Sequence, residues 1–199
     1  MALKILDKWD IEKVEVTDAG LKKYINLKQM VVPRTFGRFT GKPFHKSQMN
    51  IIERLANHIF VSGHRGKKHI ISSGSNVGQT FKVWKIIEDT FDILEERTKK
   101  NPVEVFVKAV ENAALREEIT SFQVGGIIVR KAVITSPQRR IDLALRLITQ
   151  GSYQRAFNNP KRMADALADE IFAAYNYDSQ NSHAIKEKER IEREAGGAR

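Results

Sequence analysis

Apolar residues repeat every three or four positions through most of the chain after residue 46, the spacing of helices that bury one face. The first such segment begins with Ser47 as its expected N-cap and ends before Gly63. A longer segment runs from Gln79 to about Lys99, and a mostly charged one, expected to be solvated or bound to a partner, covers about 182–195. Three others open with a capping residue followed by proline: Asn101 and Pro102, Ser136 and Pro137, Asn159 and Pro160. The pattern therefore predicts about six helices.

The stretch between the third and fourth predicted helices breaks this periodicity. Two runs rich in β-branched and aromatic residues flank the adjacent glycines Gly125 and Gly126. Adjacent glycines favour a two-residue hairpin turn, because both central residues of such a turn need positive φ. The turn implies four strand pairs: Val124 with Ile127, Gln123 with Ile128, Phe122 with Val129, and Ser121 with Arg130. We expect a two-stranded β-ribbon at about 119–134 that packs on the helices or on a partner, because an isolated ribbon is marginal in water.

The first 46 residues lack sustained helical periodicity and contain several prolines and glycines. They predict an irregular N-terminal extension lying across the surface, with one short strand at 24–32. The expected fold is therefore mainly α. It comprises this extension over 1–46 and a helical domain over 47–199, from which the β-ribbon protrudes.

Charge is distributed unevenly along the chain, whose formal net charge is +10. Between Ala19 and Ile87 there are 13 basic residues and one acid, Glu53, and the segment 119–163 holds eight basic residues and one acid. No acid occurs from Thr120 to Arg140. Folding cannot neutralise such blocks from within, so an external polyanion is the expected partner. The alternative is that the basic blocks serve solubility or face acidic blocks of the same protein.

Two adjacent arginines, Arg139 and Arg140, occupy the first turn of a predicted helix. A cation there opposes the helix dipole by about 0.3–1 kcal/mol, whereas a bound phosphate would reverse the sign. Arg130 and Lys131 on the adjoining strand add positive charge. The pair therefore predicts an anion-binding position, unless both side chains are merely solvated.

Basic residues between 34 and 46 alternate with phenylalanine and glycine. Arginine and lysine contact phosphates, aromatic rings cover unstacked bases, and glycine lets a backbone approach closely. The segment therefore predicts an RNA-binding arm, whose cations are Arg34, Arg38, Lys42 and Lys46. The alternative, for at least one phenylalanine, is that the ring fastens the arm to the core.

Several classes of protein are not supported by the sequence. No apolar run approaches the roughly 18 residues that span a bilayer, the early acids argue against a targeting peptide, and cysteine is absent. A phosphate-binding loop is rejected because Gln79 stands where the lysine is needed. The histidines His58, His64 and His69 have no carboxylates near them in the sequence, so no metal site is expected. Neither a cofactor site nor a catalytic constellation emerges.

Four segments in this order resemble the small-subunit ribosomal protein seven family: NPVEVFVKAVENAALREE before a glycine-turn ribbon, SPQRRIDLALRLI after it, then ADALADEIFAAYN and NSHAIKEKERIERE. The resemblance covers roughly Phe44 to the C-terminus. The extension and the last of these segments are similar to the archaeal and eukaryotic branch of the family.

The resemblance implies a helical bundle that binds the 3′ major domain of small-subunit ribosomal RNA and helps nucleate assembly of the subunit head. It places the protein in the cytoplasm, within the ribosome and beside other head proteins, with its ribbon near the exit-site tRNA and the messenger. It also places the loop from His64 to His69 on the RNA. The expected RNA-binding residues are Arg34, Arg38, Lys42, Lys46, Arg65, Lys67, Lys68, Lys131, Arg139 and Arg140. The ribbon residues expected near tRNA or messenger are Phe122, Gln123, Gly125, Gly126, Ile128 and Arg130.

Two rival functions remain open at this point. A DNA-binding regulator of the helix-turn-helix kind could use SPQRRIDLALRLI as its recognition helix, although the ribbon and arm would then be surplus. An RNA-modifying enzyme is the other, although it would lack a visible cofactor loop or nucleophile.

Overall fold

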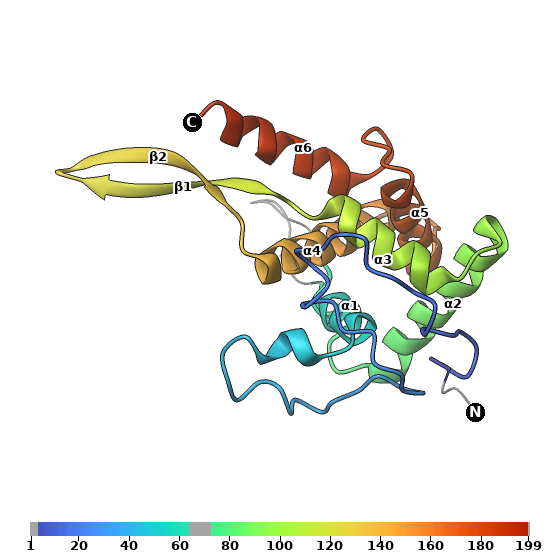
Figure 1. Ribbon diagram of the computed structural model, residues 1–199. Coiled ribbons are helices and arrows are strands. Elements are labelled where there is room, and N and C mark those ends of the chain that lie inside the picture. Colours follow the sequence, from blue (N-terminus) through green and yellow to red (C-terminus); the bar gives the residue numbers. More distant parts are fainter. Residues whose placement is uncertain (1–3, 64–72, 199) are drawn as a thin grey trace.

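The computed structural model describes residues 4–63 and 73–198 of the chain (Figure 1). Within these residues six α-helices and one two-stranded antiparallel sheet are present, which confirms a mainly α fold with a β-ribbon. The elements in order are a 3-10 helix His45–Gln48, α1 Ile51–Phe60, α2 Thr80–Thr98, α3 Pro102–Ala113, β1 Glu117–Val124, β2 Ile127–Ile134, α4 Pro137–Ala156, α5 Met163–Tyr175 and α6 His183–Gly196.

The core forms where the apolar faces of the helices meet around α5, which contacts α2, α3, α4 and α6. Phe91 of α2 and Phe106 of α3 are fully buried, with their ring centroids 6.0 Å apart. Leu145 of α4 and Ile171 of α5 are fully buried in the same cluster. Burial of these faces supplies the main stabilisation of the bundle, because the hydrophobic effect scales with the apolar area removed from water.

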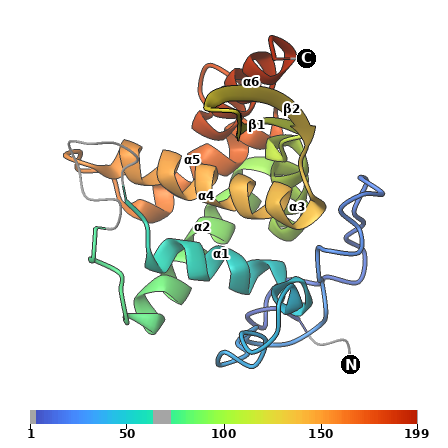
Figure 2. The ribbon, with the colours of Figure 1, turned by 90° about the vertical axis from the view of Figure 1, so that its left-hand side faces the viewer.

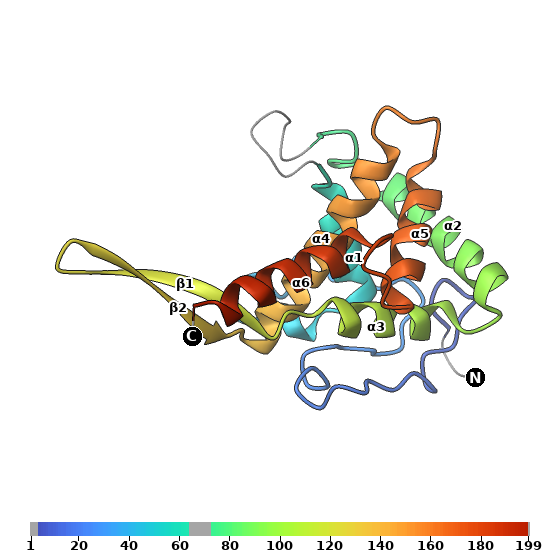
Figure 3. The same ribbon diagram turned by 90° about the horizontal axis from the view of Figure 1, so that it is seen from above.

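The N-terminal segment runs along the outside of α3, as Figure 3 shows, but its apolar side chains belong to the core. Trp9 packs edge-on against Phe91 with ring centroids 5.4 Å apart, and its Nε1 donates a hydrogen bond of 2.8 Å to Glu95. The buried apolar residues of this segment are Ile5, Trp9, Ile11, Val14, Leu21 and Ile25. The irregular extension thus also contributes side chains to the core, while its place as a separate surface unit over 1–46 stays a prediction.

The strand expected at 24–32 is wrong. Only one isolated bridge, between Asn26 and Asn50, pairs this segment with another part of the described chain. Asn50 instead holds the segment through its side chain, whose Nδ2 donates to the Lys28 carbonyl at 3.0 Å. Within 4–63 and 73–198 no second strand pairs with it over several residues, so the β-rich composition has no ladder to join.

Two predicted helix starts are wrong for local reasons. The helix α1 begins after Asn50, whose Oδ1 accepts from the Ile52 amide at 2.9 Å, whereas Ser47 lies in the preceding 3-10 helix. The helix α5 begins after Arg162 and not after Asn159. The Nδ2 of Asn159 donates to the Arg155 carbonyl at 2.9 Å, so this residue completes the end of α4.

The other predicted starts agree with the structure. Asn101 caps α3 by accepting from the Val103 amide at 3.0 Å, with Pro102 in the first turn. Pro137 opens α4 as expected, but the side chain of Ser136 makes no capping hydrogen bond. Gln79 and Lys99 flank α2.

The ribbon has the predicted register and turn. Val124 pairs with Ile127 and Phe122 with Val129, and Gly125 and Gly126 adopt φ of 57° and 85°. The strand β1 begins two residues earlier than expected, β2 ends at Ile134 as expected, and the far half of the ribbon projects away from the bundle (Figure 1). Contact with the helices is confined to the base, where the Ala132 amide donates to the Ala198 carbonyl at 3.4 Å.

The terminal helix α6 is more deeply packed than its charged sequence suggests. It lies beside α4 and the base of the ribbon (Figure 3). Ala184 and Ile185 are fully buried, and the Nζ of the buried Lys188 donates to the Asn112 carbonyl at 2.7 Å. The expectation of a solvated helix is therefore corrected: one side of α6 closes the bundle.

A buried carboxylate connects the last three helices. Glu170 of α5 has no exposed surface and accepts hydrogen bonds from the Ser182 hydroxyl at 2.8 Å and the Ala184 amide at 2.9 Å. Its other oxygen pairs with Arg155 of α4 at 3.1 Å. Gly151 makes room for this arrangement, since a Cβ there would lie 2.8 Å from the carboxyl carbon of Glu170.

Candidate nucleic-acid interface

The arm, residues 34–46, is held to the bundle by the one acid of its charge block. Glu53 of α1 is buried, and its Oε1 accepts from the amide of Thr35 at 2.8 Å and from the Thr35 hydroxyl at 2.7 Å. This carboxylate is turned inward and fixes the root of the arm. It therefore does not neutralise the cations further along the arm.

All four predicted cations of the arm are exposed, and three of them have no acidic partner among the described residues. Arg34, Arg38 and Lys42 pair with no carboxylate among the described residues, whereas Lys46 forms an ion pair with Asp142 of α4. The guanidinium carbon of Arg34 lies 4.5 Å from the centroid of the Phe36 ring. The arm thus presents concentrated positive charge together with an aromatic face.

Two phenylalanines of the arm, Phe36 and Phe44, do not fasten it to the core. Phe36 is 80% exposed and Phe44 is 76% exposed, while the half-buried Phe39 meets His45 with ring centroids 6.5 Å apart. The anchoring alternative is therefore wrong for Phe36 and Phe44. Their rings remain open to solvent or to a ligand.

The ribbon carries the second group of cations. Arg130 and Lys131 are exposed, as are Phe122, Gln123 and Ile128. Figure 2 looks at the side from which the ribbon projects and shows α4 and α1 crossing between the ribbon and the arm. Arg130 and Lys131 have no carboxylate partner among the described residues, so the ribbon adds free positive charge on this side.

The two adjacent arginines of α4 have different environments. Arg139 is about half exposed and makes a bidentate pair with Glu118 of β1, at 2.5 and 2.7 Å. Arg140 is only 13% exposed, and its guanidinium donates to Asp18 at 2.7 Å and to the Leu115 carbonyl at 2.9 Å. Successive helix residues point about 100° apart. The structure therefore places Arg139 on the surface and commits Arg140 to holding the N-terminal segment.

The pKa of the Asp18 carboxyl group reflects its pairing with Arg140. Burial is the largest single influence on its pKa and acts to raise it, but the hydrogen bonds from Arg140 and the Gly20 amide outweigh burial. The pKa of Asp18 consequently lies below its ordinary value. A charged Asp18 is the form that pairs with Arg140 near neutral pH.

Further cations, which the sequence alone did not identify as binding residues, extend the positively charged surface formed by the arm and ribbon. Arg146 is exposed on α4 and lines a hollow of about 490 Å³ together with Phe44, Lys46 and Arg139. It follows Arg139 by seven residues, two helical turns, and this spacing could have identified it. Lys22, Lys23 and Lys28 were missed because they precede the aromatic part of the arm.

The loop that contains the remaining candidates lies outside the described residues. These candidates are Arg65, Lys67 and Lys68, with the histidines His64 and His69. Elsewhere in the chain, over 4–63 and 73–198, no three histidine, aspartate or glutamate side chains come together as metal ligands. Across the same ranges, no helix is both long and apolar enough to cross a membrane.

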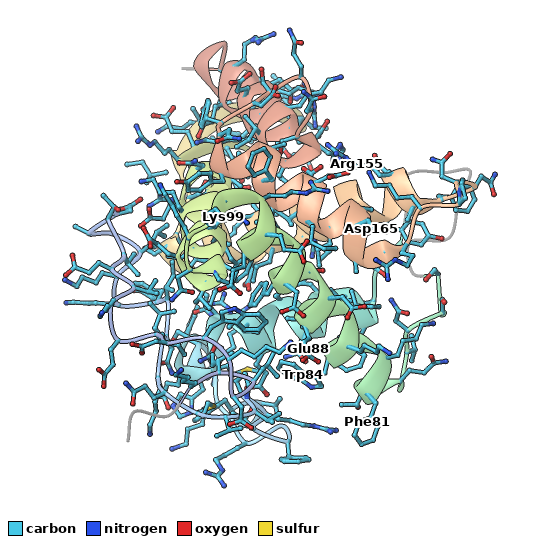
Figure 4. The ribbon with its side chains drawn as sticks, turned by 90° about the vertical axis from the view of Figure 1, so that its right-hand side faces the viewer. Phe81, Trp84, Glu88, Lys99, Arg155 and Asp165 are labelled. Carbon is cyan, nitrogen blue, oxygen red and sulfur yellow. The ribbon has the colours of Figure 1, made fainter. Side chains whose placement is uncertain are left out.

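The side of the molecule away from the ribbon has a different character (Figure 4). There α2 presents Trp84 and Glu88, and Phe81 is 91% exposed near the start of the helix. Lys8 of the N-terminal segment pairs with Glu88 at 2.9 Å and with Asp92 at 3.0 Å. Acids on this side thus have cationic partners within the protein, in contrast to the cations of the arm and ribbon.

The cluster around Asp142 contains a histidine whose charge is suppressed. The pKa of His58 is lowered to about 4, mainly by burial; the charge of Asp142 raises it, and Arg54, Arg146 and Lys46 lower it. Arg54 is nearly fully buried and donates to Asp142 at 2.9 Å. His58 is therefore neutral in the folded protein at neutral pH.

We expect this histidine to lower the free energy of unfolding as pH decreases from about 6.5 to 4. Because its folded pKa lies below the unfolded value of about 6.5, the unfolded state takes up a proton first as pH decreases from 6.5 to 4. Its contribution is fully favourable above pH 6.5 and decreases by about 2 kcal/mol by pH 5. Urea unfolding at pH 7, 6 and 5 should show a shallower pH dependence for His58→Gln than for the wild type. Parallel curves for the two proteins would contradict the prediction.

Comparison with known proteins shows which family the chain is similar to. The family model described as "Ribosomal protein S7p/S5e" matches residues 21–199. The chain is 48% identical over 199 residues to "Small ribosomal subunit protein uS7" of Nanoarchaeum equitans, with full coverage of both chains. It is 45% identical over 198 residues to the protein of the same name from Methanosphaera stadtmanae, again over 100% of each chain. The corresponding protein of Methanothrix thermoacetophila is 44% identical over 197 residues, covering 99% of this chain and 100% of its own.

Proposed function

Because the chain belongs to the ribosomal protein S7p/S5e family of structural, non-enzymatic ribosomal proteins, we propose that it binds the 3′ major domain of small-subunit ribosomal RNA and helps nucleate assembly of the subunit head. It is a cytoplasmic protein of the small ribosomal subunit, with ribosomal RNA and other ribosomal proteins as its partners. The expected family is confirmed, and its archaeal character agrees with the relatives described above.

The observation that carries the proposal is the imbalance of paired and unpaired charge. Arg34, Arg38 and Lys42 of the arm and Arg130 and Lys131 of the ribbon lack carboxylate partners among the described residues. Cations of this kind displace counterions from nucleic acid, which stabilises binding and makes it depend on salt. Fixed positions on a folded scaffold add selectivity for the shape of a folded RNA.

The exposed apolar ribbon supports the finer part of the proposal. Val124, Ile127 and Ile128 near its tip are all more than half exposed. Contiguous exposed apolar surface is characteristic of interaction sites. We assign this far half of the ribbon to the region of the exit-site tRNA and messenger, where an assembly would cover it.

The DNA-binding alternative gains no support from the helix it requires. The proposed recognition helix, α4, packs against α1, α3, α5 and α6, and Ile141 and Leu145 are fully buried. Of its arginines near the N-terminus, Arg140 is engaged with Asp18 and Leu115. A recognition helix must offer one whole face to the major groove. Little of that face remains free in α4.

The first experiment measures binding of the full chain to 3′ major domain RNA over a salt series, with unrelated RNA of equal length and duplex DNA as competitors. We expect selective binding to the domain RNA that persists at moderate salt. Replacing Arg38 and Lys42 together by alanine should reduce the magnitude of the salt slope by about 1.5, because two phosphate contacts are lost.

A double alanine variant at Lys13 and Lys85 is the matched control, since both lysines are exposed and lie outside the arm and ribbon. It removes the same charge but should change the salt slope by much less. Equal binding to all three nucleic acids, or equal effects of the two double variants, would show that net charge alone is being measured. Either result would overturn the proposed function.

A further inference from the structure

A hollow of about 850 Å³ lies between the arm and the N-terminal segment. Its charged lining consists of Lys22, Lys23, Lys28, Arg34 and Arg38, and no carboxylate contributes to the wall. None of these five cations has an ion-pair partner within residues 4–63 and 73–198. Like charges gathered around an unfilled space repel one another, so the arrangement is favourable only with an anion in place.

The same hollow presents an aromatic ring that folding does not explain. Phe36 lines this hollow, is 80% exposed and has a φ of 50°, and the following Gly37 has a φ of 77°. A bulky aromatic residue in the left-handed region is strained by about 1 kcal/mol or more. With this backbone conformation, the ring lies outside the core and beneath the guanidinium group of Arg34. An exposed, strained ring is expected where a ligand provides the missing contact.

We propose that this hollow receives an unpaired nucleotide of the bound RNA, with its base stacked beside Phe36 and Arg34 and its adjoining phosphates held by the lysines and Arg38. The inference rests on the proposed function and specifies one contact within it. Unstacked bases are commonly held on aromatic rings or guanidinium planes, and each such contact is worth enough to decide binding.

The dimensions and chemistry of the hollow favour this occupant. Its volume lies within the range of about 300–1,000 Å³ that is typical of small-ligand sites, so a single nucleotide fits whereas a duplex does not. A base paired in a duplex also hides the faces that a ring would stack on. The side chain of Gln48 lines the hollow and offers an amide to a base edge. An acidic peptide would use the cations and leave the ring and its strain without a role.

The test compares two exposed phenylalanines on different sides of the molecule. Phe81 is 91% exposed near the start of α2, on the side away from the ribbon, and does not line this hollow. Phe36→Ala should weaken binding of the 3′ major domain RNA about tenfold without changing the salt slope, because a stacking contact and no cation is lost. Phe81→Ala should change the affinity less than twofold. Thermal unfolding of both variants verifies that each is folded.

A short oligouridylate serves as a second probe, because its binding does not depend on recognition of the folded domain. Phe36→Ala should weaken it as well, so a protein that lacked selectivity for the domain RNA would still show whether the nucleotide site exists. Unchanged affinity of Phe36→Ala for both probes, or equal losses in the two variants, would overturn the inference. So would a polyglutamate peptide that displaces the oligouridylate at comparable concentration.

Ultraviolet crosslinking of the wild-type protein to the domain RNA locates the contact directly. After trypsin treatment, the nucleotide adduct should be found on the peptide from Thr35 to Arg38 or on its neighbour from Phe39 to Lys46. Adducts confined to peptides outside 22–48 would contradict the proposal even if the full chain binds the RNA selectively.

Discussion

Replacing Glu170 with alanine is expected to lower the free energy of unfolding by about 3–5 kcal/mol, the cost of removing one partner from a buried charge network. The substitution leaves Ser182 and the Ala184 amide without their acceptor and leaves Arg155 without its counter-charge. Because Ala184 lies in the first turn of α6, the negative carboxylate also interacts favourably with the positive end of that helix dipole. Urea unfolding followed by circular dichroism measures the loss.

A matched control lies on the same helix. Asp165 of α5 pairs with Arg162 at 3.0 Å, but this pair is exposed and joins residues of a single turn (Figure 4). Asp165→Ala should therefore cost less than about 1 kcal/mol. Glu170→Gln keeps one acceptor and should lie between the two. A Glu170→Ala protein that unfolds within 1 kcal/mol of the wild type would show that the buried network contributes little.

Arg140→Ala is expected to destabilise the protein by about 2–3 kcal/mol, because hydrogen bonds to charged groups contribute about 1.5–3 kcal/mol and Arg140 makes one to Asp18 besides that to Leu115. The loss should appear as a lower urea midpoint. It should also detach the N-terminal segment, so that trypsin cleaves at Lys22 and Lys23 faster than in the wild type.

Arg139→Ala separates stability from RNA binding. Its pair with Glu118 is largely exposed, so the substitution should cost less than about 1 kcal/mol of stability. It should nevertheless weaken binding of the domain RNA. If the Arg140→Ala and Arg139→Ala proteins have the same urea midpoint and the same rate of tryptic cleavage, Arg140 does not hold the N-terminal segment as we expect.

The sequence predicted the elements whose signals are local. The paired glycines at 125 and 126 were sufficient for the ribbon and its register, because turn type determines which residues face each other. Asn101 followed by Pro102 likewise marked the start of α3. The same pattern at Asn159 was misleading, since its amide completes the preceding helix, and only the path of the chain after α4 distinguishes the two uses.

The N-terminal segment shows the limit of periodicity. Its buried residues, from Ile5 to Ile25, follow no helical or strand repeat, because an irregular chain buries side chains wherever its path meets the bundle. For the candidate interface, exposed cations of the arm and ribbon follow from charge and composition. Burial of Arg140 does not, because its partner Asp18 is 122 residues away.

The embedded N-terminal segment has a consequence for how the protein forms during synthesis. Trp9 leaves the translating ribosome long before Phe91 and Glu95, on which it packs, and Asp18 precedes Arg140 by 122 residues. Contacts between such distant residues slow folding, because the intervening chain must be ordered before they form. The apolar residues that emerge first therefore remain uncovered until most of the chain has been made. In this interval the nascent protein is exposed to aggregation and to chaperones, which bind unburied apolar surface.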